Sequence, residues 1–193
     1  MGYLRLVAAL VTLALASAPA AAAPYLIDHD HSAITFSASH LGFSRFHGRF
    51  TSWRGEIDFD PEAIENSSVR FEIDAESFET GSKTRDDNTK YFPDMLNVKV
   101  FPKITFVSTR IELTSAETVR MTGDLTIRDV TRPVTFDVRL NARGVTPISR
   151  GKEVFGFTAA GEIDRAAFGI GFAAPAVSGI VPVRIDLEIM PAN

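Results

Sequence analysis

The histidines are the first residues in this sequence whose types and spacing could do chemistry. His29-x-His31 places two imidazoles on one face of a strand, with Asp28 and Asp30 beside them, and zinc sites use such ligands. The chain contains no cysteine, and no histidine follows His47. Since nothing further along the chain completes a ligand set, we predict no metal and no cofactor. The alternative is an enzyme that acts on a quinone or lipid with a metal held by His29 and His31.

Other acid–base residues lie at positions that the sequence pattern assigns to solvent. Carboxylates recur two residues apart, as in Asp58 with Asp60 and Glu72 with Asp74. Such pairs share one face of a strand, and we predict that they solvate an outer wall. Arg85 with Asp86 could contact a ligand head group or form a local ion pair, and we favour the ion pair. No nucleophile elbow, phosphate-binding loop, dinucleotide fingerprint or zinc-protease helix occurs, so no catalytic residue is predicted.

Strands must position these residues, because apolar and polar residues alternate along most of the chain. In the clearest stretch, 119–140, the alternation indicates two half-buried strands joined by a short turn. Asp129 suits the turn, and Pro133, which cannot donate to a ladder, is expected where the second strand begins. The same alternation covers 34–38, 46–50, 57–59, 69–75, 104–106, 155–163 and 181–189.

Each strand has one apolar and one charged face, which favours an antiparallel sheet around a single apolar interior. We predict an all-β fold, an antiparallel eight-stranded barrel, because closure removes exposed edges; a sandwich is the alternative. Gly55 either bends one long strand or separates two. Residues 76–102 break the alternation, and a helix start at Thr84-Arg85-Asp86-Asp87 predicts a short helical cap over one mouth. Residues 166–178, rich in Gly, Ala and Phe, form a second irregular segment.

Residues 1–23 have the features of a signal peptide, with a basic start at Arg5, an apolar run, and small residues for cleavage near Ala22 or Ala23. Residues 24–193 then form one domain of ~170 residues, large enough for a substantial core. The net charge is -4, with 20 Lys and Arg against 24 Asp and Glu, which argues against nucleic acid as a partner. We expect a periplasmic protein without stable membrane insertion. Its oligomeric state stays open, a homodimer included.

Phenylalanine dominates the aromatic residues, with fifteen against one tryptophan and three tyrosines. Phe carries no polar group, so these rings belong where water is absent. Either they fill the core or they line an apolar bore that holds a long-chain lipid, and the sequence leaves both open. The residues predicted to point inward and contact such a ligand are Phe36, Phe50, Phe71, Ile73, Phe92 from the cap, Phe106, Leu125, Ile127, Phe136, Val138, Phe157 and Ile185.

Short motifs occur in order along essentially the whole mature chain. They are His31-Ser32-Ala33-Ile34-Thr35-Phe36-Ser37, His40-Leu41-Gly42, Gly48-Arg49-Phe50, Ser77-Phe78-Glu79-Thr80, Arg85-Asp86, Phe101-Pro102 with Phe106, Leu125-Thr126-Ile127-Arg128, Val130-Thr131-Arg132-Pro133-Val134, and Asp164-Arg165 with Phe168-Gly169. In this order they resemble the YceI-like family of polyisoprenoid-binding proteins. The chain departs from the family pattern at Asn88, where the family usually has His, and at Asp129, where it usually has Gly.

The resemblance implies a lipocalin-like barrel, usually exported, whose interior holds an isoprenoid or similar long-chain lipid, with no established catalytic residues. We therefore predict a periplasmic lipid-binding protein, not an enzyme, that holds a quinone or prenyl phosphate for transport, storage or sequestration. A membrane-spanning barrel, which also alternates, and a filled-core interaction module are the remaining alternatives. Whether Arg128 or Arg132, at the tip of the 119–140 hairpin, meets a head group stays open.

Overall fold

The computed structural model describes residues 23–192, so the predicted signal peptide, except for Ala23, lies outside the described residues. The strands are β1 (Ala23–Ile27), β2 (Ala33–His40), β3 (Ser44–Phe50), β4 (Trp53–Phe59), β5 (Ser68–Asp74), β6 (Phe78–Glu79), β7 (Lys103–Leu113), β8 (Thr118–Ile127), β9 (Val130–Val145), β10 (Glu153–Asp164) and β11 (Ile180–Pro191). Between them lie the helix α1 (Lys83–Tyr91) and the 3-10 turns η1 (His29–His31), η2 (Ile64–Asn66), η3 (Ala75–Ser77) and η4 (Arg165–Phe168). Among residues 23–192, no helix is long and apolar enough to cross a membrane.

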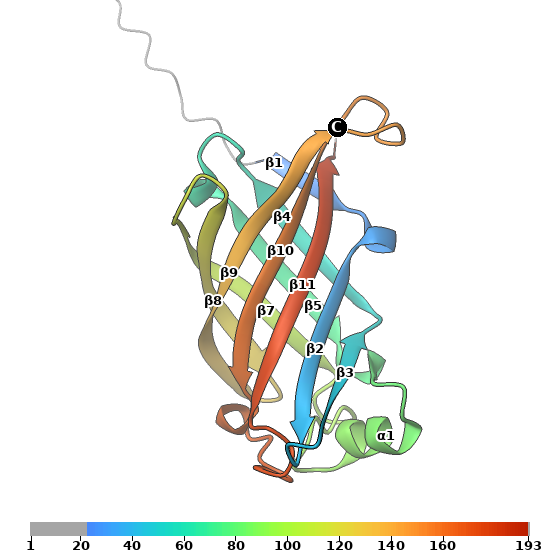
Figure 1. Cartoon of the computed structure of the whole chain (residues 1–193). Helices are drawn as coiled ribbons and strands as arrows, with labels where there is room; N and C mark the ends of the chain where they lie inside the picture. The colour runs from blue at the N-terminus through green and yellow to red at the C-terminus, as the bar shows by residue number, and fades with distance from the viewer. Residues whose placement is uncertain (1–22, 193) are drawn as a thin grey trace, which may run out of the picture.

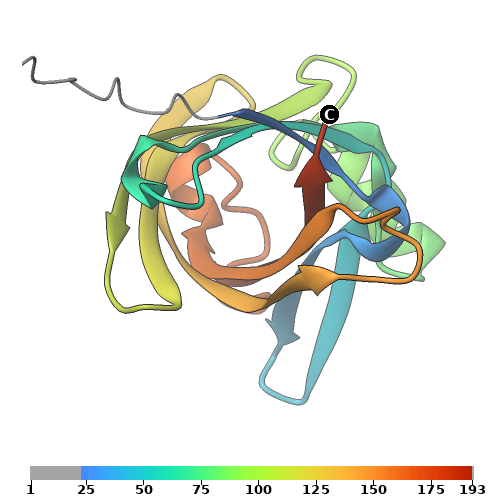
Figure 2. The ribbon, with the colours of Figure 1, turned by 90° about the horizontal axis from the view of Figure 1, so that it is seen from above.

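Eight of the strands form a closed ring in the order β1, β4, β5, β7, β8, β9, β10, β11. The ring closes because β1 pairs with β4 on one side, Tyr25 opposite Ile57, and with β11 on the other, Leu26 opposite Met190. Every pairing in the ring is antiparallel. Figure 1 shows this elongated barrel from the side, and Figure 2 shows it from above. The predicted antiparallel eight-stranded barrel is confirmed.

A hairpin of β2 and β3 extends the sheet beyond the ring. β2 pairs with β11, Ile34 opposite Ile185, and β3 pairs in turn with β2 and with the short β6. Figure 2 shows this hairpin projecting away from the ring of strands. The predicted strand at 46–50 therefore belongs to this hairpin, whose inward residues Phe36 and Phe50 still pack against the core. The strand that closes the ring is β1, which the alternation did not reveal.

The alternation places apolar side chains inside the barrel and charges outside. In β10 and β11, the inward pairs are Phe155 with Ile189, Phe157 with Leu187, and Ala159 with Ile185. On the outer wall, Glu72 lies 3.0 Å from Arg54 and 2.9 Å from Lys103. A membrane-spanning barrel requires the reverse arrangement, with apolar residues on the outside.

Three local predictions differ from the structure. The break between the strands of 46–59 falls at residues 51–52, and Gly55 lies inside β4. Pro133 is the fourth residue of β9 and lies opposite Asp124 of β8. At this point β9 does not yet pair with β10, so its other edge is free. A free edge tolerates proline, which has no backbone N–H to donate. Asp60, predicted on the outer wall, is buried. Its carboxylate accepts hydrogen bonds at 3.0 Å from the backbone N–H groups of Glu62 and Ala63, which offset the cost of burial.

Inward phenylalanine rings lie against glycines of neighbouring strands. A Cβ at Gly48 would lie 2.2 Å from the Phe36 ring, and one at Gly123 would lie 2.3 Å from the Phe106 ring. Contacts this close are possible only where no side chain is present. Phe71 and Phe136 lie over Gly55 and Gly161 in the same way. The glycines let large rings lie close to the wall instead of reaching across the interior.

We predict that Gly55→Ala destabilises the protein by about 1–3 kcal/mol, as overpacking does. The new methyl would lie 2.6 Å from Ile27 and 2.8 Å from Phe71, so both side chains would be pushed inward. Gly156→Ala is the matched control, because the nearest atom to its Cβ is 3.8 Å away. Urea denaturation should show a lower midpoint for Gly55→Ala only; equal midpoints for both variants would contradict the packing argument.

Candidate ligand-binding site

A cavity of about 1130 Å³ lies inside the barrel. Its volume lies slightly above the ~300–1,000 Å³ range that is usual for small-molecule sites. The rings therefore line the interior without filling it. All the residues predicted to contact a ligand are on its wall except Phe92: Phe36, Phe50, Phe71, Ile73, Phe106, Leu125, Ile127, Phe136, Val138, Phe157 and Ile185.

Phe92 lies outside the cavity wall. Helix α1 ends at Tyr91, and Phe92 has an extended backbone, with φ -67° and ψ 138°, so helical periodicity no longer governs where its ring points. The ring packs instead against Phe172, with centroids 6.0 Å apart. Met95 and Leu96, further along the same connection, reach the cavity in its place.

The two ends of the cavity differ in their polar side chains. Glu62, Glu65 and Glu117 border the end next to η2, together with one cation, Arg143. The end next to α1, called the α1 end below, is bordered by hydrogen-bond donors and contains no carboxylate among its lining residues: His40, Ser44, Ser82, Thr84, Arg85, Asn88 and Thr89. Residues exposed to solvent border both ends.

Two cations line the α1 end, Arg165, described below, and Arg85. The predicted ion pair with Asp86 is not formed, because both side chains bind Thr80 instead. Arg85 donates from Nε to the Thr80 hydroxyl at 2.7 Å and from Nη2 to the Thr80 carbonyl at 3.1 Å, while Asp86 accepts from the Thr80 N–H at 2.9 Å. The guanidinium also lies 4.2 Å from the centre of the Phe46 ring. Thr80 thus holds Arg85 at the cavity edge. The sequence had predicted an ion pair between Arg85 and Asp86 instead.

The segment 165–178, which joins β10 to β11, covers the α1 end of the barrel and is organised by Arg165. This buried guanidinium donates to the carbonyls of Ile170, Phe172, Val177 and Ser178 at 2.7–3.0 Å. Burial lowers the pKa of Arg165, which the neighbouring Asp164 only partly opposes. Its donors are directed to the backbone, so its role here is to hold the segment in place.

Arg128 and Arg132 hold the same segment from outside. Arg128 donates to the carbonyl of Gly169 at 2.9 Å, and Arg132 donates to the carbonyl of Ala167 at 2.7 Å. Neither side chain lines the cavity. Both arginines fasten the 128–132 turn region to segment 165–178.

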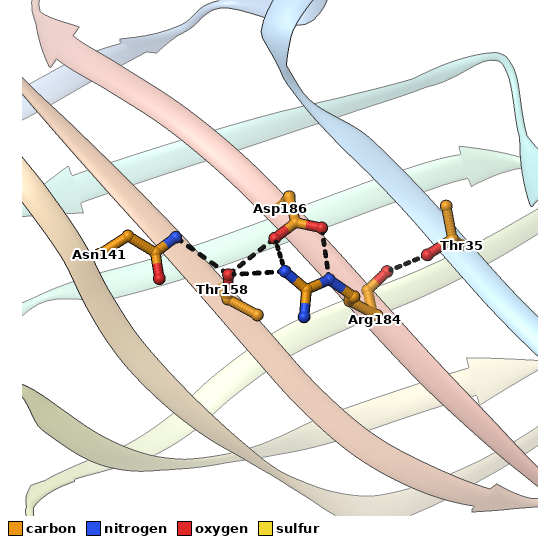
Figure 3. A network of polar contacts seen from close by, with 5 residues as sticks. All are labelled: Thr35, Asn141, Thr158, Arg184 and Asp186. Carbon is orange, nitrogen blue, oxygen red and sulfur yellow. Dashed lines mark hydrogen bonds and ion pairs between the residues drawn. The ribbon is translucent and has the colours of Figure 1, made fainter.

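A polar network crosses the outer wall on β9, β10, β11 and β2 (Figure 3). Arg184 binds both carboxylate oxygens of Asp186 at 2.7 Å, and Thr158 joins Asp186 at 2.7 Å and Asn141 at 2.9 Å. Burial would raise the pKa of Asp186, but hydrogen bonds from Arg184 and Thr158 outweigh it and lower the pKa. A carboxylate fixed in this way braces the wall and is a poor proton donor or acceptor.

The alternative of a metal held jointly by His29 and His31 requires the two rings to face one another, and they do not. The ring of His29 packs on Trp53, with centroids 4.4 Å apart. His31 Nδ1 lies 2.8 Å from Asp28 Oδ2, and Glu188 is the other potential ligand nearby. None of the three lines the cavity, and of them His31 is exposed while Asp28 and Glu188 are half-buried.

The YceI-like domain family matches residues 25–189 of this sequence. The chain belongs to the YceI-like family. A UPF0312 protein of Pseudomonas fluorescens is 35% identical over 182 residues, covering 93% of each chain. The crystal structure of a Campylobacter jejuni YceI protein is 28% identical, with a TM-score of 0.72 over 80% of this chain and 90% of that one. A polyisoprenoid-binding domain of Saccharophagus degradans shares the fold at 17% identity, with a TM-score of 0.59 over 86% of this chain and 98% of that one.

Two features of this YceI-like site were missed by sequence reasoning. One is the buried Arg165, which was noted only as part of the Asp164-Arg165 motif. Its burial could have been inferred from the sequence, because a single arginine is followed there by the apolar segment 166–177. The other is the difference between the ends of the cavity. It arises from loops that lie far apart in the chain, so no local pattern could have revealed it.

The Asp28–His31 contact predicts a measurable titration. A hydrogen bond to Asp28 raises the pKa of His31, and the same bond lowers the pKa of Asp28. Stabilisation by the charged pair is therefore present between the two unfolded values, about 4 and about 6.5. It is lost as pH rises through the folded pKa of His31 or falls through that of Asp28. NMR titration should place the His31 pKa above about 6.5 and show a decrease in Asp28→Asn; an unchanged value in that variant would contradict the assignment.

Proposed function

We propose that this protein holds one long-chain isoprenoid lipid, such as a quinone or a prenyl phosphate, inside its barrel for transport, storage or sequestration. The observation that carries the proposal is the apolar cavity of about 1130 Å³ that runs between the two ends of the barrel. The polyisoprenoid-binding domain of Saccharophagus degradans, which shares the fold, supports the same class of ligand.

Burial of the ligand tail would supply most of the affinity. Each buried methylene contributes about 0.8 kcal/mol, so about ten methylenes would supply about 8 kcal/mol. Before the costs of ordering the chain are subtracted, that corresponds to a micromolar dissociation constant. Such a site needs few polar contacts, which fits a wall made largely of Phe, Ile, Leu and Val side chains.

The polar ends of the cavity would orient the ligand. Three carboxylates at the η2 end would repel a phosphate, whereas Arg85, Asn88 and His40 at the α1 end offer donors to a phosphate or a quinone oxygen. We therefore place the head group at the α1 end and the tail toward η2. Asn88 can donate to such a head group through its amide, although the family usually has His at this position.

The same geometry favours binding over catalysis. His40 and Ser44, opposite each other in β2 and β3, line the α1 end, but in the described part of the chain no hydrogen bond joins their side chains. The fixed Asp186 and the exposed His31 both lie on the outside. We also propose that the protein acts in the periplasm after removal of a signal peptide near Ala22 or Ala23. The lipid-binding role does not depend on this location.

Filling the cavity from one position tests the proposal. Ala159 points into the cavity and the adjacent Ala160 is exposed on the outer wall, so Ala159→Phe and Ala160→Phe add the same group on opposite faces of β10. We expect Ala159→Phe to weaken uptake of farnesyl phosphate or a quinone, delivered with cyclodextrin, by about tenfold or more, because it displaces buried methylenes. Ala160→Phe should bind as the wild type does. No uptake by the wild type, or equal uptake by both variants, would contradict the proposal.

A further inference from the structure

The tip of the β2–β3 hairpin exposes two large apolar side chains. Phe43 is 90% exposed and Leu41 is 57% exposed, on a hairpin that projects from the barrel (Figure 2). Leu41 also has a φ of 51°, a conformation that glycine or asparagine adopts at lower cost than leucine. A strained backbone that presents an apolar side chain to water points to a function at this tip.

Hydrogen bonds fix this tip beside the α1 end of the cavity. The N–H of Leu41 donates to the carbonyl of Ala176 at 2.6 Å, and the N–H of Ser178 donates to the carbonyl of Ser39 at 3.0 Å. Segment 165–178 in turn is held by Arg165. The tip is therefore a rigid continuation of the structure that borders the cavity.

Two more exposed aromatic residues lie at the same end. Phe172, 48% exposed, is part of the cavity border, and Phe92, 39% exposed, packs against it. We call Leu41, Phe43, Phe92 and Phe172 the mouth patch. Phe172 belongs both to the cavity wall and to the outer surface, so the apolar lining reaches the outside at this end.

The charge of the hairpin indicates what this patch contacts. Between Ala33 and Phe50 the titratable side chains are His40, Arg45, His47 and Arg49, with no Asp or Glu, in a chain whose net charge is -4. Arg49 is paired with Glu79, whereas Arg45 donates to the hydroxyl of Ser37 at 3.1 Å. A basic hairpin with an apolar tip is complementary to an anionic lipid surface, where rings enter the interface and arginines meet phosphates.

We propose that the mouth patch docks the protein peripherally on an anionic lipid surface, with the α1 end of the cavity facing the lipid. This inference rests on the proposed function, because docking there lets a lipid pass between bilayer and cavity without crossing water. The tail enters first and the head group stays at the α1 end, near Arg85 and Asn88.

Vesicle flotation tests the docking directly. The purified protein is mixed with vesicles of phosphatidylcholine alone or of phosphatidylcholine with phosphatidylglycerol. The test variant is Leu41→Asn with Phe43→Ser, in which Asn tolerates the positive φ. Ile148→Ser is the matched control, since Ile148 is 76% exposed in the β9–β10 connection at the opposite end. We expect binding to the anionic vesicles to fall about tenfold or more in the double variant and to stay unchanged in the control.

Uptake of farnesyl phosphate from cyclodextrin, measured on the same proteins, separates the two proposals. If the mouth patch docks on lipid, the double variant should keep this uptake and lose vesicle binding. Wild-type uptake without vesicle binding would overturn docking and leave the lipid-binding function intact. Vesicle binding without uptake would support docking and overturn the proposed function. The wild type could instead be a dimer that does not bind vesicles, while the double variant is a monomer. That result would show that the mouth patch contacts a second copy of this chain, and it would overturn the proposal.

Discussion

Close contact between phenylalanine rings and glycines is the constraint on which the interior of this barrel depends. An eight-stranded barrel is just wide enough for its own side chains to fill it. Gly48 and Gly123 let Phe36 and Phe106 lie against the wall, and a cavity of about 1130 Å³ remains. The phenylalanine excess and the open bore therefore have one cause: rings supply apolar surface, and glycines keep that surface at the periphery.

The cavity also requires stable ends, and arginines at the α1 end meet this requirement. Arg165 from inside, and Arg128 and Arg132 from outside, donate to backbone carbonyls of segment 165–178. Because hydrogen bonds to a charged donor are the stronger ones, a segment rich in Gly and Ala keeps a defined shape next to the opening. The same segment fixes the tip of the β2–β3 hairpin, so the shape of the opening and the position of the mouth patch are set together.

Much of the wall could be predicted from the sequence, because alternation is a local property: Phe71 and Phe157 were assigned inward and line the cavity. The misses involve contacts that alternation does not encode. β1 is five residues long and is defined by its partners in β4 and β11. Arg85 and Asp86 looked like an ion pair, yet both bind Thr80. Phe92 was assigned inward as part of a helix that ends at Tyr91.

A bore that holds a single lipid should be visible by native mass spectrometry of protein purified without detergent. We expect a species heavier than the polypeptide by the mass of one long-chain isoprenoid. Denaturation should return the mass of the bare chain, and the isoprenoid should appear in the organic extract. The mass of the polypeptide alone, both as purified and after incubation with quinone or prenyl phosphate, would show that the bore holds no such lipid.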